Sequence, residues 1–556
     1  MQSTRQYYLK ADVQLEPLIN SWYAWPLLVA PATLAMITGN AHLRIMESFV
    51  RAPELNRSAA RNPAMRGGPF MDYGGDVADI HRLIASTKAN LGELVTLAAS
   101  IKELDQRLAT EGKGASLAAC YSLVPAALRG FVELGYDLGN HPSARFIEGL
   151  LYRSRYYKPS LQSLLLSTVK DDSRPFVLST PRLPSATEAQ LRLPFNANEV
   201  DTLASMRSHP QGAQFVDELL EEHAGASERD LLRSFFTEAP SVAVEGRNYV
   251  GSGVRIRYCG HACVLLETPD VAILTDPVIS YPIEGSVPRY SFRDLPDRID
   301  YVLLTHAHQD HVLFETLLQL RHKVGAWIVP KNSGGALQDP SLKQMLTVLG
   351  FKNVVEFDEM ESLELPEGQL TGLPFLGEHG DLHVRTKLAF HVRLRGSTFL
   401  FAADSNNLQD EMYDHIHASV GDVDHVFIGM ECDGAPMSWL YGPLFTKPID
   451  RRLDQTRRLN GSNYERARGI VDRLSPKSVY VYAMGQEPWL GYISSIAYTA
   501  ESTPIVESDR LVAECRRRGL VARRLFGREG IVIEARQPPR VAPLNVAASP
   551  TVAVAN

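Results

Sequence analysis

The chain has 556 residues, of which 45% are hydrophobic and 22% are charged, so it is a folded protein too long for one core of about 150 residues. Acidic residues outnumber basic ones by seven, which argues against the positive field that nucleic-acid-binding proteins need. The five cysteines are irregularly spaced, which excludes a disulfide framework and fits a reducing, cytoplasmic setting.

The first 245 residues are expected to be mainly helical. An early apolar stretch at 22–37 contains two prolines, so we interpret it neither as a signal peptide nor as a membrane span. Apolar residues at intervals of three and four then predict a helix over 76–108. Similar patterns predict helices over 116–138 and 214–236.

From about Tyr249 the pattern changes to short, β-branched strands separated by turns. Helical stretches, including 313–321 and 464–474, alternate with these strands and predict two sheets covered by helices. The last twenty or so residues carry four prolines and no periodicity. We therefore predict an α+β protein with a mainly helical N-terminal domain at 1–245, a catalytic domain at 246–535 and a loosely held tail at 536–556.

A cluster of metal-binding residue types follows one predicted strand, in the segment 301–311, which reads YVLLTHAHQDH. In an extended chain, residues two apart point the same way, so His306 and His308 can bind one ion while Asp310 and His311 reach a second. Asp404 closes the predicted strand STFLFAAD and is placed to bridge two ions. The sequence therefore predicts a dinuclear metal site.

The next candidate ligands lie in the segment FLGEHGDLH, where Glu378 precedes His379 and either side chain can bind a metal. No histidine follows His425, so the site is poor in imidazole and rich in carboxylate. Zinc is well served by nitrogen ligands, whereas carboxylate-rich dinuclear sites suit iron that binds O2. The composition of the site therefore favours iron.

The HxHxDH segment and the later aspartate resemble the metallo-β-lactamase superfamily, which implies an αββα sandwich for the C-terminal part of the chain. Over nearly the full chain, further segments resemble the metallo-β-lactamase-fold di-iron β-hydroxylases of nonribosomal peptide pathways, among them LEPLINSWYAWPLLVAPATLA, GEHGDL, AADSNN and GMECDGAP. This resemblance implies a monooxygenase that uses two iron ions and O2. Its substrate would be an amino acid, aromatic or aliphatic such as leucine, held as a thioester on a carrier domain.

The resemblance also implies roles for individual residues. One iron would be bound by His306, His308 and Glu378, the other by Asp310 and His311, and Asp404 would be shared. Glu378 is preferred to His379 on the strength of this likeness. With Glu378 and Asp404, we expect Glu431 to be catalytic, and we expect His261 and Asp433 to orient ligands or substrate without binding metal.

The expected partners follow from what the sequence contains and lacks. No flavin or nicotinamide fingerprint occurs, so an external electron-transfer protein is implied. We expect a homodimer formed through residues 1–245.

Trp439 and Tyr441 are expected to pack in the core, and the arginines at 451, 452, 457 and 458 to form a solvated face rather than a docking site for the carrier. The alternative function is a dinuclear zinc hydrolase acting on an ester or phosphodiester.

Overall fold

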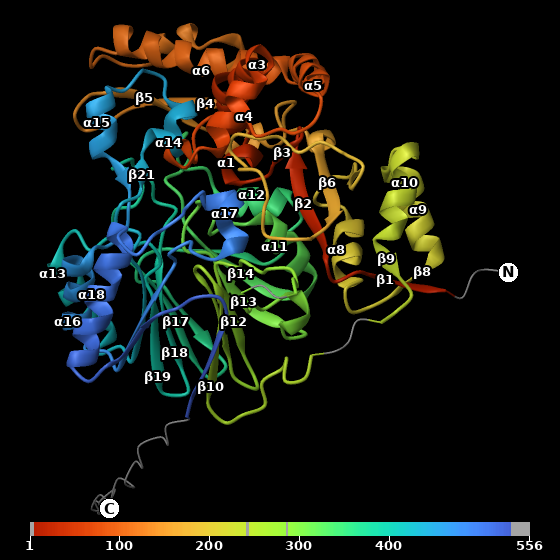
Figure 1. Cartoon of the computed structure of the whole chain (residues 1–556). Coiled ribbons are helices and arrows are strands. Elements are labelled where there is room, and N and C mark those ends of the chain that lie inside the picture. Colours follow the sequence, from red (N-terminus) through yellow and green to blue (C-terminus); the bar gives the residue numbers. More distant parts are fainter. Residues whose placement is uncertain (1–4, 241–243, 285–286, 535–556) are drawn as a thin grey trace, which may run out of the picture.

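The computed structural model describes residues 5–240, 244–284 and 287–534 (Figure 1). Two seven-stranded sheets form the C-terminal half of the chain. The first has the order β15 (Val354–Phe357), β14 (Val324–Pro330), β13 (Ile299–Leu303), β12 (Ala272–Thr275), β11 (Cys263–Glu267), β10 (Val254–Gly260) and β25 (Glu529–Ile533). The second has the order β16 (Ser362–Leu365), β17 (Gly368–Leu373), β18 (Ala389–Leu394), β19 (Ser397–Phe401), β20 (His425–Gly429), β23 (Ser478–Tyr482) and β24 (Val521–Arg524).

Helices cover the outer faces of the two sheets, which confirms the predicted αββα sandwich. A buried cluster that includes Ile256, Val264, Phe390 and Phe427 fills the space between the sheets. The helices of this half are α11 (Phe314–Leu320), α12 (Leu342–Val348), α13 (Asp410–Val420), α14 (Ser438–Tyr441), α15 (Arg451–Thr456), α16 (Tyr464–Leu474), α17 (Gly491–Ser494) and α18 (Thr503–Arg517). Of these, α13, α16 and α18 pack on the second sheet through a separate apolar cluster.

The N-terminal half is mainly helical, as predicted. Its helices are α1 (Pro26–Val29), α2 (Pro31–Ile37), α3 (Leu43–Arg51), α4 (Pro53–Arg61), α5 (Val77–Asn90), α6 (Gly92–Glu111), α7 (Glu148–Leu151), α8 (Asn198–Ser205), α9 (Ala213–His223) and α10 (Arg229–Ser234). It also contains a four-stranded sheet of β3 (Trp22–Tyr23), β2 (Val13–Ile19), β6 (Gln162–Thr168) and β7 (Glu188–Leu191) that the sequence did not predict. Strand β2 is buried along its whole length, so it lacks the alternation that marks a half-exposed strand.

One predicted helix is wrong and two others are interrupted. Residues 116–138 form two short 3-10 turns and the strand β4 (Val132–Tyr136), because Pro125 and Gly130 break the helical pattern. The helix predicted over 76–108 is two helices, α5 and α6, which meet at Leu91. The helix predicted over 214–236 divides around Gly225 into α9 and α10.

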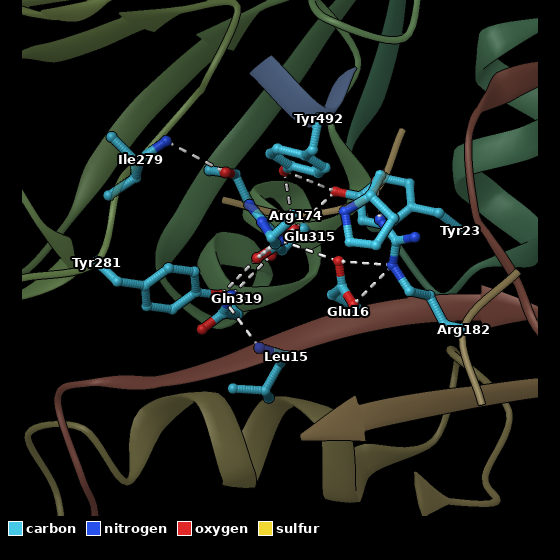
Figure 2. Close-up of polar contacts among 12 residues, drawn as sticks. Leu15, Glu16, Tyr23, Arg174, Arg182, Ile279, Tyr281, Glu315, Gln319 and Tyr492 are labelled. Atoms are coloured by element: carbon cyan, nitrogen blue, oxygen red, sulfur yellow. Dashed lines mark hydrogen bonds and ion pairs between the residues drawn. The ribbon is translucent and has the colours of Figure 1, made fainter. Parts of the chain in front are cut away.

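The two halves share one core and a buried polar junction. A single hydrophobic cluster contains residues of both halves, from Leu15 and Trp22 to Leu317 and Trp327. The carboxylate of Glu315 on α11, which is buried, accepts hydrogen bonds from four side chains that are drawn in Figure 2. The donors are the hydroxyls of Tyr23 (2.8 Å), Tyr281 (2.9 Å) and Tyr492 (3.0 Å) and Nη1 of Arg174 (2.9 Å).

The predicted boundary at residue 245 lies between β9 (Phe236–Thr237) and the start of β10 at Val254. It stays a prediction, because the shared core makes the halves continuous in space. The predicted tail at 536–556 lies outside the described residues. Among the described residues, no helix combines the length and the apolar character that a membrane crossing requires.

Candidate metal centre

The predicted metal-binding residues lie in the loops that follow strands of the two facing sheets. His306 and His308 follow β13, Glu378 follows β17 and Asp404 follows β19. The backbone is left-handed at Glu378 (φ 69°) and at Ala403 (φ 45°), immediately before Asp404. Non-glycine residues rarely adopt this conformation and do so most often at functional sites. The backbone is therefore strained at or next to residues that carry candidate ligand atoms.

One half of the site consists of His306, His308 and Glu378, whose potential ligand atoms all lie within 4.8 Å of one another. His308 Nδ1 lies 2.9 Å from Oε1 of Glu378, and His306 Nε2 lies 3.8 Å from its Oε2. All three side chains are buried. The geometry thus brings together the three residues proposed for the first iron.

The other half contains His311 and Asp310, together with His261 from the turn between β10 and β11. The ligand atoms of these three also lie within 4.8 Å of one another. His261 Nε2 lies 3.2 Å from His311 Nε2 and 3.4 Å from Oδ2 of Asp310. Asp404 joins the two halves, because it forms a third such group with His306 and His311.

The sequence placed His261 outside the ligand set, whereas the structure brings its ring among the converging atoms of Asp310 and His311, so its role as a ligand is a prediction. Its backbone is left-handed (φ 51°) and the preceding Gly260 has φ 113°, where a side chain would clash with Trp489. This turn carries the imidazole to the cluster from a strand distant in sequence from HxHxDH. The sequence signal, a Gly-His pair between two strands, is too short to reveal that approach.

His379 has a different environment from its neighbour Glu378. It belongs to none of the three groups of converging ligand atoms. Its Nδ1 lies 3.2 Å from Oε2 of Glu378, and its ring lies beside that of His308 with the centroids 4.5 Å apart. Burial lowers the pKa of His379 well below its usual range. Of the two residues left open by the spacing, the geometry favours Glu378 as the ligand.

Several polar atoms of the cluster are buried and lack a hydrogen-bond partner among the described residues, as is expected of atoms that bind a metal ion. They are Nε2 of His306, Oε2 of Glu378, Oδ1 of Asp404 and Nδ1 of His261, and Nε2 of the neighbouring His379 is also without a partner in the described part of the chain. Burial lowers the pKa of His306 well below its usual range, so this imidazole is neutral and can bind a cation. Burial also raises the pKa of Glu378 to about 7. The donor set fits a pair of metal ions.

His311 is oriented by a carboxylate outside the cluster. Its Nδ1 donates to Oδ2 of Asp276 (2.8 Å), which leaves Nε2 facing Asp404 at 3.1 Å. Although burial opposes the charged form, Asp404 and Asp276 raise the pKa of His311 well above its usual value. Asp276 in turn accepts hydrogen bonds from the backbone and hydroxyl of Thr305. Such carboxylate–histidine pairs fix the ring orientation of metal ligands.

Comparisons with known proteins identify the family. The family described as diiron non-heme beta-hydroxylase N-terminal domain matches residues 8–240, and the beta-lactamase superfamily domain matches residues 272–439. A Streptomyces venezuelae protein named 4-amino-L-phenylalanyl-(CmlP-peptidyl-carrier-protein) 3-hydroxylase is 41% identical over 94% of this chain and 98% of its own length. The chain belongs to the di-iron non-haem β-hydroxylase family. The crystal structure of CmlA, a diiron beta-hydroxylase from Streptomyces venezuelae, superposes with a TM-score of 0.90 at 39% identity, covering 96% of this chain and 100% of that one.

A cavity of about 230 Å³ adjoins the metal-binding cluster of this β-hydroxylase and is lined in part by Trp439, Leu440 and Ile496. Trp439 packs against the core, as expected, but it also lines this cavity, and its Nε1 donates to the carbonyl of Gly67 (2.8 Å). Tyr441 is buried as expected, and its hydroxyl forms a 3.1 Å hydrogen bond with Nε2 of His308. Segment 439–441 therefore shapes the pocket and orients a ligand.

The remaining predicted residues differ in their placement. Glu431 lines the cavity, whereas Asp433 is exposed and lies outside the ligand groups. The four arginines divide into two pairs. Arg457 and Arg458 donate to backbone carbonyls of the loops around the site, at Gly380, Asp433 and Gly434, while Arg451 and Arg452 are exposed on α15.

Proposed function

We propose that this protein β-hydroxylates an amino acid, aromatic or aliphatic such as leucine, that is tethered as a thioester to the carrier domain of a nonribosomal peptide synthetase. The observation that carries the proposal is the meeting of Glu378 with His306 and His308, which gives the first metal position a carboxylate. The Streptomyces venezuelae relative is named as a hydroxylase of a carrier-bound aminoacyl group. A pocket that adjoins the ligands can hold the side chain of such a group.

In this proposal His306, His308 and Glu378 hold one iron, Asp310, His311 and His261 hold the other, and Asp404 lies between them. When bound, the iron pair supplies the reduction of O2 that breaking a C–H bond requires. The chain supplies positioning: Asp276 and Tyr441 orient His311 and His308, and the apolar wall at Trp439 and Leu440 excludes water from the reacting carbon.

The reaction consumes one O2, two electrons and two protons; one oxygen atom is placed on the β-carbon and the other is released as water. We propose that an external electron-transfer protein delivers the electrons, that the chain forms a homodimer through its N-terminal half, and that it works in the cytoplasm. Sedimentation of the purified protein tests the dimer, and a monomer at working concentration would contradict it.

The decisive experiment incubates the reduced, iron-loaded enzyme and O2 with carrier domains loaded with different amino acids, followed by mass spectrometry of the carrier. We expect a gain of one oxygen atom on the preferred aminoacyl group and far slower reaction of the free amino acid, because the carrier contributes positioning energy. Absence of oxygen transfer to any aminoacyl carrier, with ester cleavage by the zinc form, would favour the hydrolase alternative instead.

A further inference from the structure

Glu431 presents a carboxylate to the cavity beside the metal-binding cluster. It lies two residues after the end of β20 and lines the same cavity as Asp310, Glu378 and Asp404. The hydroxyl of Tyr498 donates to its Oε1 (2.8 Å), and the backbone N–H of Gly434 donates to its Oε2 (2.6 Å). These two neutral donors hold the carboxylate in place.

No cationic side chain forms an ion pair with Glu431 in the described part of the chain. Two fully buried carboxylates of this protein do have cationic partners: Glu16 contacts Arg174 and Arg182, and Glu267 contacts Arg255 and Arg257. None of the ion pairs between described residues includes Glu431. A carboxylate partly withdrawn from water is costly unless a positive charge compensates it, so Glu431, unlike Glu16 and Glu267, is left to take a cationic partner from a ligand.

The iron pair does not remove this imbalance. Asp276, Asp310, Glu378, Asp404 and Glu431 are five carboxylates in or against the cluster. Two divalent ions carry four positive charges, and neutral imidazoles add none. Counted with both ions, the five carboxylates leave one negative charge, and the cationic side chain among the described residues that line the cavity, Arg66, is exposed. A ligand with one positive charge would balance that negative charge.

We propose that Glu431 binds the α-ammonium group of the tethered amino acid. This inference rests on the proposed function and adds the subsite that recognises the substrate backbone. In an aminoacyl thioester the carboxyl group is masked, so the ammonium is the one charge that every such aminoacyl group carries itself, apart from the phosphodiester of the pantetheine arm. A carboxylate held by two hydrogen bonds is suited to a charge-assisted bond with it. The ammonium then fixes the α-carbon, and with it the position of the β-carbon relative to the metals.

The proposal fixes the order of hydroxylation and of acylation of the α-amine. Acylation of the α-amine, as in formation of a peptide bond, removes the charge that Glu431 recognises. Hydroxylation therefore precedes the condensation reaction that acylates the amine, and peptidyl carriers are not substrates.

The test compares three carriers loaded with the same side chain: the amino acid, its N-acetyl derivative and the α-hydroxy acid analogue, which removes the charge without adding bulk. Both the rate of oxygen incorporation and the affinity of the fluorescently labelled loaded carrier are measured. For the wild-type protein we expect the free amine to be preferred about 100-fold, the size typical of losing one partner of a buried charge pair. Glu431→Gln should lower activity on the free amine to the level of the α-hydroxy analogue, while the exposed control Asp433→Asn should keep the preference.

The outcomes separate this inference from the proposed function. Hydroxylation of the free-amine and α-hydroxy carriers at equal rates and equal affinities by the wild-type protein would overturn the subsite and leave the hydroxylase function intact. Equal loss on all three carriers in Glu431→Gln, with the preference unchanged, would show that Glu431 only supports the loop, and would also overturn it. Oxygen transfer to none of the carriers would contradict the proposed function itself.

Discussion

Glu378 and His379 are adjacent in the chain, yet only the carboxylate reaches the converging ligand atoms. We predict that Glu378→Ala lowers iron binding to the first metal position and abolishes hydroxylation, whereas His379→Ala retains about two iron ions per chain, as a dinuclear site requires. Iron analysis and product yield of the two purified variants measure this. Full hydroxylation by Glu378→Ala, together with iron loss in His379→Ala, would show that His379 and not Glu378 binds the metal.

His261 lies closer to the metal-binding cluster than the sequence pattern indicated. Because its Nε2 lies 3.2 Å from that of His311, we predict that His261→Ala lowers the iron content from about two ions per chain toward one. Asp433→Asn, a nearby exposed change, is the control and should leave the iron content unaltered. An unchanged iron content in His261→Ala, with only a slower reaction, would restore the orienting role that the sequence suggested.

At the scale of elements, α11 connects the metal-binding segment to the N-terminal half. The helix begins three residues after His311, and its Glu315 shares Arg174 with Glu16 of β2 (Figure 2). The guanidinium of Arg174 also stacks over the ring of Tyr492, 3.3 Å from its centroid. The position of Asp310 and His311 therefore depends on contacts made by both ends of the chain.

Removal of Arg174 leaves two buried carboxylates with fewer partners. We predict that Arg174→Met lowers the free energy of unfolding by about 3 kcal/mol, the cost typical of breaking a buried ion pair. The matched control is Arg298→Met, whose side chain is 76% exposed and pairs with Asp300, and which should cost less than about 1 kcal/mol. Urea denaturation of the three proteins gives these values. Equal losses in both variants would mean that the junction adds nothing beyond a surface pair.

Helix α7 reaches the catalytic half through Glu148, which accepts hydrogen bonds from the backbone of Ser341 (2.9 Å) and the amide of Asn332 (3.1 Å). Burial raises the pKa of Glu148 to about 7, and nearby Asp339 and Glu356 add to this. The folded state therefore keeps a proton that the unfolded state releases at lower pH. The contribution of Glu148 to stability is fully present below the pKa of the unfolded chain and is lost as the pH rises through 7.

We predict that Glu148→Gln removes this dependence. The free energy of unfolding of the variant, relative to wild type, should rise by on the order of 1–2 kcal/mol between pH 5 and 8. Denaturation curves at several pH values test this, with Glu133→Gln, a largely exposed partner of Arg145, as the control. Parallel pH profiles for wild type and Glu148→Gln would contradict the assignment.

At the scale of the whole molecule, the sequence was most informative where one local pattern decides the structure. The strands that carry His306 and Asp404 are short, β-branched and bounded by turns, and they were predicted correctly. Strand β2 was missed because both its faces are buried, and the helix expected over 116–138 failed because a proline and a glycine outweigh its apolar spacing. The approach of His261 to His311 depends on the strand order of the first sheet, in which only β12 separates the β10–β11 hairpin from β13, and no local pattern records that order.

The shared core also predicts that the catalytic half does not fold alone. A chain that begins at Tyr249 would lose Tyr23 and Arg174 from the junction and expose the apolar residues of α11 and α12 that face the N-terminal half. We expect it to aggregate and to retain no stoichiometric iron, as measured by light scattering and metal analysis. Cooperative unfolding of that fragment with two bound iron ions would show that the halves are independent.

The junction around Glu315 has a consequence for how the protein is made. Glu16 and Arg174 leave the ribosome early, Glu315 follows midway, and Tyr492 emerges only when most of the chain has been translated. Until then the nascent polypeptide carries an unfinished junction and an uncovered apolar face, which is the state that chaperones bind. Maturation of the iron site is therefore a late event in biosynthesis, and truncated translation products cannot acquire it.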